Sequence, residues 1–168
     1  DVQVYQAELE MQNEELRQAQ SALQASRDRY LQLYNEAPTG YITLDAGAVV
    51  VRFNRTFAEM LDKAPADIVN KPFFSWIDPL DRDVFLGRFK AFFNQPADKH
   101  MELRLVGPSG HRPWVRIQGR RLAAADAEPP GDHVHLDLAG PGHLGHPVPP
   151  VGAGDLLVGV GQAGQHLQ

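Results

Sequence analysis

A glycine-rich segment near the end of the chain comes closest to a cofactor-binding motif. Gly159, Gly161 and Gly164 follow an apolar Leu-Leu-Val run with the spacing GxGxxG. In dinucleotide-binding proteins this spacing lets the backbone approach a pyrophosphate, and a helix and a second strand must come after it. Only four residues follow Gly164 in this sequence. We therefore expect the segment to have no cofactor role.

Histidine pairs in the same region are the nearest approach to a metal site. His133 and His135 share one face of an alternating segment, and His143 and His146 lie nearby in the sequence. Protein zinc sites combine histidine with cysteine or carboxylate ligands at set spacings. The chain has no cysteine, and no carboxylate is arranged with these histidines. The sequence therefore predicts no metal site.

Three closely spaced carboxylates, Asp78, Asp81 and Asp83, are the candidates for acid–base chemistry. Asp78-Pro79 is, however, a helix-start signal, with a capping residue followed by proline at its favoured first position. The helix dipole favours acidic residues in the turn that follows. No Ser-His-Asp set, phosphate loop or kinase signature accompanies these carboxylates. We predict no catalytic residue and a chain that is not itself an enzyme.

Composition and charge limit the partners that the chain can have. At 168 residues with 43% hydrophobic residues, one domain with a core plus extensions is expected. Residues 1–121 hold all 16 Lys and Arg residues and 16 of the 21 acidic residues, so this part is neutral and gives no electrostatic case for binding nucleic acid. No apolar run approaches the roughly 20 residues that span a bilayer. We expect a cytoplasmic location and no direct membrane contact.

The first 35 residues predict one long helix with a heptad repeat. They contain no glycine or proline, and residues with good helix propensity dominate. Two series of residues repeat every seven positions and together form what we call the heptad seam. We expect a modest parallel coiled coil, weakened at two polar positions; the alternative is a single helix that docks its leucines on the neighbouring domain. The seam consists of Val2, Tyr5, Leu9, Gln12, Leu16, Ala19, Leu23, Ser26, Tyr30 and Leu33.

The middle of the chain predicts two hairpins separated by helices. Alternating apolar residues indicate strands over 41–45 and 48–53, then over 100–106 and 114–118. The longest helix between them begins at Asp78-Pro79 and ends at Asn94-Gln95-Pro96. This order is typical of an α+β layer with an antiparallel sheet and helices on one face.

An ordered set of short segments carries a family resemblance. The segments are Ala37-Pro38-Thr39-Gly40-Tyr41, Asn54, Ile77-Asp78-Pro79 with Asp81-Arg82, Glu102-Leu103-Arg104-Leu105, Gly110 and Trp114-Val115. Together they resemble a PAS domain of the bacterial sensory-box type over about residues 36–122. Residues 8–17 also resemble the helical linker before such domains in sensor histidine kinases. The resemblance implies the PAS fold, with a five-stranded antiparallel sheet and a pocket between the sheet and the helices, here preceded by a long N-terminal helix.

The resemblance requires a fifth strand, which we look for in the tail. The alternation over His133–Leu138 makes residues 123–139 the expected last strand. Residues 140–168 are rich in glycine and proline and are expected to form a disordered or non-native tail. The chain is thus divided into a coiled-coil helix over 1–35, a PAS core over 36–122, and these two tail segments.

The resemblance also implies where a ligand would bind. The candidate pocket residues are Asn54, Trp76, Phe85, Phe89 and Arg104, although apolar residues at helical spacing more often form core. Arg104 is expected to pair with Glu102 or Asp45 at the surface. The long helix contains no histidine that could hold haem, so we expect no haem. The cysteine that LOV-type flavin chemistry needs is missing, so we expect no such flavin. The sequence identifies no other cofactor.

Trp114 and the seam define the expected interface. Alternation places Trp114 on the solvent face of its strand, where an aromatic side chain of this size needs a cover. We expect the N-terminal helix or a partner subunit to cover it, with Leu9, Leu16, Leu23 and Tyr30 forming the helix interface of a homodimer. The function indicated is a sensory module that binds a small ligand or dimerises and relays a signal to an attached histidine kinase or cyclase. The alternative is a ligand-free dimerisation or protein-interaction module.

Overall fold

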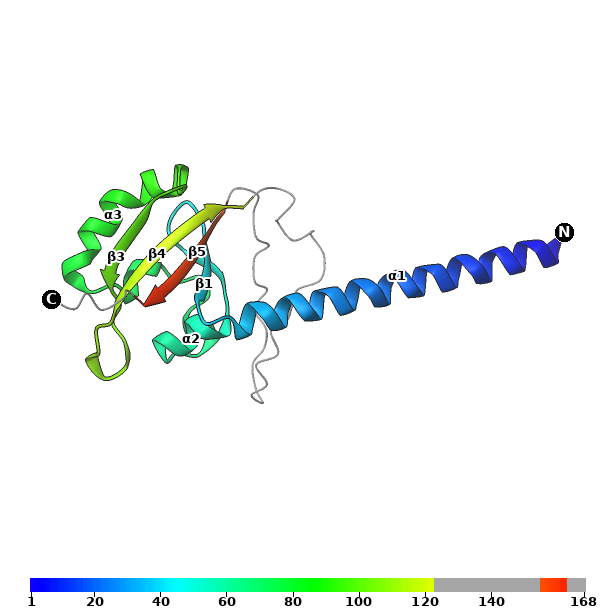
Figure 1. Cartoon of the computed structure of the whole chain (residues 1–168), viewed down its shortest axis with the longest axis horizontal. Helices are drawn as coiled ribbons and strands as arrows, with labels where there is room; N and C mark the ends of the chain where they lie inside the picture. The colour runs from blue at the N-terminus through cyan, green and yellow to red at the C-terminus, as the bar shows by residue number, and fades with distance from the viewer. Residues whose placement is uncertain (123–154, 163–168) are drawn as a thin grey trace. The chain divides into compact units, whose positions relative to one another are not determined.

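A computed structural model describes residues 1–122 and 155–162 of the chain. The described residues form two units, Asp1–Ala37 and Pro38–Gln168, the second within the described ranges. The first unit is a single helix, and the second is a sheet with helices (Figure 1). Each unit is described separately below.

The first unit is helix α1, Val2–Glu36, as the sequence predicts. The Asp1 side chain accepts a hydrogen bond from the Gln3 amide at 3.4 Å and so caps the N-terminus. Glutamine and acidic side chains four residues apart hydrogen-bond along the helix surface, as Gln18 does to Glu14 at 3.2 Å. The helix ends where Pro38 approaches, because the residue before a proline disfavours helical geometry.

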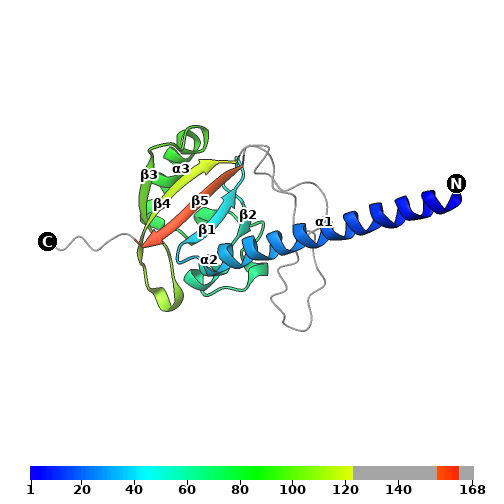
Figure 2. The same ribbon diagram turned by 45° about the vertical axis from the view of Figure 1, so that its right-hand side comes forward.

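The second unit contains a five-stranded antiparallel sheet in the order β2-β1-β5-β4-β3. Both predicted hairpins are present, and they form the two halves of the sheet on either side of β5 (Figures 1 and 2). The predicted fold class is therefore confirmed. The strands are β1 Gly40–Leu44, β2 Val50–Phe53, β3 His100–Arg104, β4 Trp114–Arg121 and β5 Leu156–Gln162.

The fifth strand is Leu156–Gln162, so the assignment of the whole span 140–168 to a disordered tail was wrong. Leu156, Val158 and Val160 point into the core and are fully buried. Gly159 lies between them and faces the other way, opposite Tyr41 on β1 and Gln118 on β4. Glycine has a low strand propensity, but a central position with neighbours on both edges outweighs it. The segment His133–Leu138, proposed for this role, lies outside the described residues.

The position of β5 also explains the GxGxxG spacing. Gly159 and Gly161 are inside the strand, on its outward face, rather than in a turn before a helix. The geometry that a dinucleotide fingerprint needs is a glycine turn at the end of a strand, with the next helix starting at once. The described part of this segment instead supplies backbone to the middle of a sheet.

Helices cover the inner face of the sheet. They are α2 Arg55–Leu61 and α3 Pro79–Asn94, with short 3-10 turns at Pro65–Asp67, Phe73–Trp76 and Pro108–Gly110. In Figures 1 and 2 both α2 and α3 lie on the same side of the sheet. One hydrophobic cluster joins the inward side chains of all five strands to these helices. Glu102 and Arg116 lie on the outward face, where they form a cross-strand ion pair at 2.7 Å.

Candidate functional site

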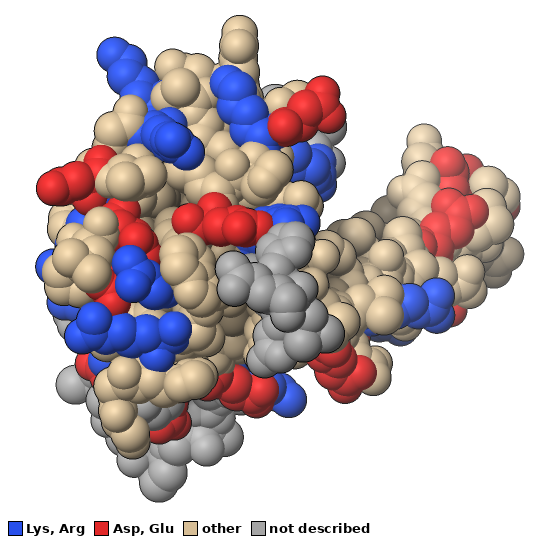
Figure 3. All heavy atoms as spheres, turned by 60° about the vertical axis from the view of Figure 1, so that its left-hand side comes forward, with Lys and Arg blue, Asp and Glu red and all other residues tan. Residues whose placement is uncertain are grey.

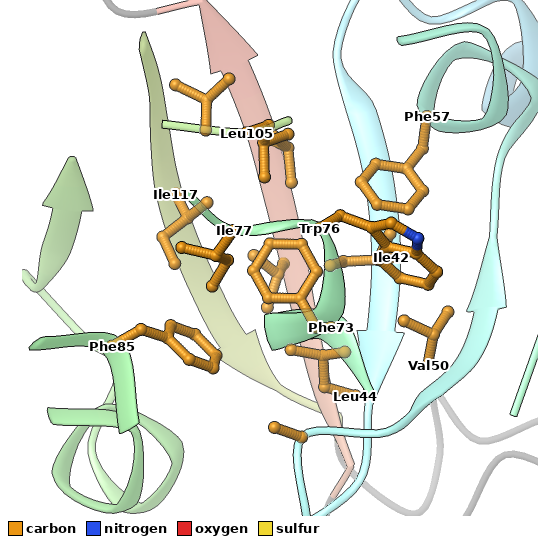
Figure 4. Packing of buried hydrophobic residues seen from close by; sticks show 14 of the residues in the cluster. Ile42, Leu44, Val50, Phe57, Phe73, Trp76, Ile77, Phe85, Leu105 and Ile117 are labelled. Atoms are coloured by element: carbon orange, nitrogen blue, oxygen red, sulfur yellow. The ribbon is translucent and has the colours of Figure 1, made fainter. Parts of the chain in front are cut away.

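The space between the sheet and the helices is filled by a connected set of aromatic rings. Phe73, from the 3-10 turn before α3, contacts Phe57 of α2 at 6.2 Å and Phe85 of α3 at 5.4 Å between ring centroids. The chain of contacts continues from Phe85 to Phe89 at 5.3 Å, and Phe57 also meets Trp76 edge-on at 6.2 Å. Figure 4 shows Phe73 between Trp76 and Phe85 at the centre of this cluster. Offset and edge-on geometries such as these are the stable ones for aromatic pairs.

Three of the predicted pocket residues belong to this aromatic cluster. Trp76, Phe85 and Phe89 are buried, with exposed fractions of 6%, 1% and 6%. Trp76 comes from the 3-10 turn before α3, and Phe85 and Phe89 come from α3 itself. The structure therefore brings these three residues together. Ordinary core packing would bring them together in the same way.

Asn54 lies at the start of α2, fully buried. Its Oδ1 accepts hydrogen bonds from the amides of Tyr41 at 2.8 Å and Phe57 at 3.1 Å, and its Nδ2 donates to the Thr39 carbonyl at 3.0 Å. Asn54 therefore caps α2, and two further bonds reach back to the segment that follows α1. Asn54 holds the first residues of β1 against the start of α2.

Arg104 lies at the end of β3 and pairs with a different partner from the two expected. Its Nε and Nη2 donate to the Asp81 carboxylate, both at 2.8 Å, and its backbone amide donates to Asp81 Oδ2 at 2.9 Å. The expected pairing with Glu102 was wrong, because Glu102 faces Arg116 across the β3–β4 pair. The Arg104 guanidinium also lies 5.0 Å from the centre of the Trp114 ring, a cation–π distance.

The ion pair shifts the titration of both groups. The hydrogen bonds from Arg104 lower the pKa of Asp81 below its ordinary 3.8, against a smaller opposing effect of burial. Asp81 in turn raises the pKa of Arg104. Both groups are therefore charged over the whole physiological range, and neither is suited to proton transfer near neutral pH.

A second ion pair lies at the N-terminus of α3. Asp78 Oδ1 accepts from the Leu80 amide at 2.9 Å as the helix cap, and Oδ2 accepts from Arg112 Nη1 at 2.7 Å. The Asp78 side chain is 0% exposed, whereas that of Arg112 is 54% exposed. Arg112 had no signal in the sequence, because it lies in a turn without periodicity, 34 residues from its partner.

Backbone contacts reinforce this junction between α3 and the β3–β4 hairpin. The Asp78 amide donates to the Arg104 carbonyl at 2.8 Å, and the Val106 amide donates to the Trp76 carbonyl at 2.7 Å. Two ion pairs and these bonds connect the start of α3 to one end of the sheet. Two of the three carboxylates that could have suggested acid–base chemistry, Asp78 and Asp81, are used for this connection.

Replacing Asp81 by asparagine should reduce stability at neutral pH and have less effect in acid. The pKa of Asp81 is lower in the folded state than its ordinary value of 3.8. The Asp81 carboxylate therefore makes its full contribution to stability above the unfolded-state pKa, and this contribution is lost as the pH falls through the lower folded-state pKa. Urea unfolding of the chain and of Asp81→Asn, at pH 7 and in steps below pH 4, measures the difference. If the difference in free energy of unfolding between the two proteins stays constant below pH 4, the charge of Asp81 is not its cause.

The predicted interface residues are exposed in the single chain. Leu9, Leu16, Leu23 and Tyr30 on α1 each expose more than half of their surface, and so does Trp114 on β4. The cover expected for Trp114 stays a prediction. Trp114 and Arg104 face each other in the β3–β4 register, so a stacked polar–aromatic pair occupies this end of the outward face.

Within residues 1–122 and 155–162, no group of three or more His, Asp or Glu residues could hold a metal ion. The described helices include none with the length and apolar content required to cross a membrane.

Comparisons with known proteins identify the fold. The family model described as PAS domain matches residues 28–96. A PAS domain of an HTR-like protein from Haloarcula marismortui is 13% identical, with a TM-score of 0.59, over 88% of this chain and 99% of the other. A domain of a sensory box sensor histidine kinase/response regulator from Geobacter sulfurreducens is 12% identical, with a TM-score of 0.54, over 82% and 95%.

Several of the similar structures contain a bound small molecule. One of them is the PAS domain, in complex with ethanol, of a transcriptional regulator of the LuxR family from Burkholderia thailandensis. It is 14% identical, with a TM-score of 0.51, over 79% of this chain and 96% of the other. The search of curated proteins gave no match. At these identities the structural likeness establishes the fold.

Proposed function

Because the chain has the PAS fold, we propose that it is a non-catalytic signalling module that dimerises through α1 and relays a signal to an attached output domain of the histidine kinase or cyclase type. The observation that carries the proposal is the heptad seam on α1. It runs along a helix of 35 residues, and its large apolar members are exposed in the single chain.

A second copy of the chain is the partner that the seam fits. Full burial of a leucine side chain is worth about 1.5–3 kcal/mol, and a parallel coiled coil would bury Leu9, Leu16 and Leu23 in three separate layers. Gln12 occupies the seam position after Leu9 and Ser26 the one after Leu23, and both weaken the contact. A moderate affinity of this kind suits a module whose helices must change their packing during signalling.

The relay would pass through the segment that joins α1 to the sheet. Asn54 hydrogen-bonds to both Thr39 and Tyr41, directly after the helix ends. Asn54 is also the N-cap of α2, whose Phe57 belongs to the aromatic cluster. A change in ring packing therefore has a short covalent and hydrogen-bonded route to the end of α1. Such a change requires a stimulus that binds the two packings with different affinity.

The outward face of the sheet supplies a second contact surface for the dimer. Trp114 stacks with Arg104 there, and Gly161 on β5 leaves open space beside the Glu102–Arg116 pair. Aromatic and arginine side chains are the residues that most often dominate interface energies. We propose that this face is covered when the dimer forms.

Binding of a small molecule inside the aromatic cluster is the second candidate function. It is favoured by the ethanol complex of the Burkholderia thailandensis domain, since a guest of that size displaces few side chains. In this chain Phe57, Phe73 and Phe85 already fill the space between sheet and helices. A guest would therefore have to move a ring, which makes relay through α1 the better supported function.

The experiment that tests the proposal is the mass of the chain in solution. Leu23→Asp places a charge in the seam, whereas Ser21→Asp places the same charge two residues away, on the opposite side of α1. Loss of the dimer in the first variant alone supports the proposal.

A further inference from the structure

The side of α3 that faces away from the core carries an unexplained apolar surface. Its members recur at spacings of four, three and four residues, which places them along one line of the helix. Leu80 is 73% exposed and Val84 is 52% exposed. The α3 stripe, as we call it, consists of Leu80, Val84, Gly87 and Ala91, and it lies opposite the buried side formed by Phe85, Phe89 and Phe92.

Gly87, in the middle of the stripe, is a glycine that no contact within residues 1–122 and 155–162 requires. Glycine in a helix interior is less favourable than alanine, because it loses more backbone entropy. A Cβ on Gly87 would meet no heavy atom within 4 Å, so no neighbour in the described residues requires glycine there. A missing side chain between Val84 and Ala91 does, however, let a second helix approach the backbone closely.

The charges beside the stripe are arranged for a second copy of the same helix. Asp83 and Lys90 are both exposed and lie on the same flank of the stripe, seven residues apart. If two α3 helices meet antiparallel with Val84 against Gly87 of the other copy, Leu80 meets Ala91 in the next layer. The same register brings Asp83 to within two residue positions of Lys90 of the other copy, about 3 Å along the helix axis, and it does so twice, once on each side of the two-fold axis.

We propose that the α3 stripe is a self-association surface that pairs antiparallel with the stripe of a second chain. In Figure 1, α3 lies at the edge of the core with the sheet on only one side of it. Figure 3, viewed from the side on which α3 lies, shows positive and negative residues interspersed with uncharged surface rather than a field of one sign. That distribution suits a self-complementary contact better than a partner of a single charge.

This contact is independent of the dimer through α1, since it uses a different element of the chain. One helix face of this length buries less than the roughly 1,200 Å² of a standard interface, so the α3 contact is weak by itself. In a chain that already dimerises through α1, it adds a second contact, either within that dimer or between dimers. In a chain without the α1 contact it produces a concentration-dependent dimer.

Charge exchange tests the pairing in the Leu23→Asp background, where α1 cannot dimerise. Sedimentation equilibrium from about 10 µM to 1 mM gives the dimer dissociation constant. Asp83→Lys or Lys90→Asp alone creates two like-charge contacts and should weaken the dimer about tenfold at low salt. The double variant Asp83→Lys/Lys90→Asp reverses both charges and should restore the dissociation constant to within about twofold.

Gly87→Gln gives a second test that does not depend on charge. Within the chain the new side chain enters open space and improves helix propensity, so the unfolding temperature should rise. Between chains it prevents the close approach, so the dimer should be lost. Leu86→Gln, on the same helix but off the stripe, serves as the matched control and should keep the dimer.

Each outcome decides the proposal. The proposal is supported if the single charge variants weaken the dimer, the double variant restores it, and Gly87→Gln abolishes it. A Leu23→Asp chain that stays monomeric to 1 mM, or a double variant as weak as the single ones, overturns it. If the unmodified chain is already monomeric at low micromolar concentration, the proposed dimer through α1 fails. The α3 contact is then tested in the unmodified chain, without the Leu23→Asp substitution.

Discussion

Phe85→Ala should lower the free energy of unfolding by about 3–5 kcal/mol, the usual range for removing a buried phenylalanine. Phe85 is 1% exposed, and the centroid of its ring lies 5.4 Å from that of Phe73 and 5.3 Å from that of Phe89. Its loss removes transfer free energy and leaves a cavity at the centre of the aromatic cluster, between α3 and the sheet. Urea unfolding followed by fluorescence and circular dichroism measures the change.

The neighbouring Leu86→Ala is the control for helix propensity. Leu86 is 49% exposed on the same turn of α3, so its replacement should cost about 0.5 kcal/mol or less. Benzene or indole should recover part of the stability lost in Phe85→Ala, because an apolar cavity of that size accepts such guests. Equal losses for the two variants would show that the rings do not form the packed centre.

Asn54→Ala should cost about 2–4 kcal/mol, because it leaves two backbone amides and one carbonyl without a side-chain partner. Asn54 is fully buried and bonds to Tyr41, Phe57 and Thr39. The loss therefore exceeds that of an ordinary helix cap, since the start of β1 is released together with the start of α2. Thermal and urea unfolding of the variant measure the effect.

Asn54→Ser separates the two roles of this residue. A serine hydroxyl caps α2 through the Phe57 amide but is too short to bond both Thr39 and Tyr41, so the loss should be intermediate. If serine restores full stability, the cap alone matters and the proposed route from the core to α1 loses its hydrogen-bonded link. If serine is as poor as alanine, the bonds to β1 dominate.

Much of the fold could be predicted because its signals are local. The seven-residue repeat indicated α1, Asp78-Pro79 indicated the start of α3, and alternation indicated the four strands of the two hairpins. Asn54 could be predicted as a cap because the side chain and the amide it bonds to are three residues apart.

The parts that could not be predicted depend on contacts between distant residues. Arg104 pairs with Asp81, 23 residues away, and the choice over Glu102 is decided by the β3–β4 register. The fifth strand could not be located because its glycines resemble a turn or tail, and only pairing with β1 and β4 makes them strand residues. The sequence could predict which candidate pocket residues lie close together. It could not predict whether their rings fill the space between sheet and helices, because that depends on how the side chains pack.

The mass of the chain at low micromolar concentration tests the central claim most directly, because the weaker α3 contact is not populated there. Light scattering should give twice 18.6 kDa for the chain and for Ser21→Asp, and 18.6 kDa for Leu23→Asp. Circular dichroism should show that the sheet unit unfolds at the same temperature in all three. A mass of 18.6 kDa for the unmodified chain, or a dimer that survives Leu23→Asp, would contradict dimerisation through α1.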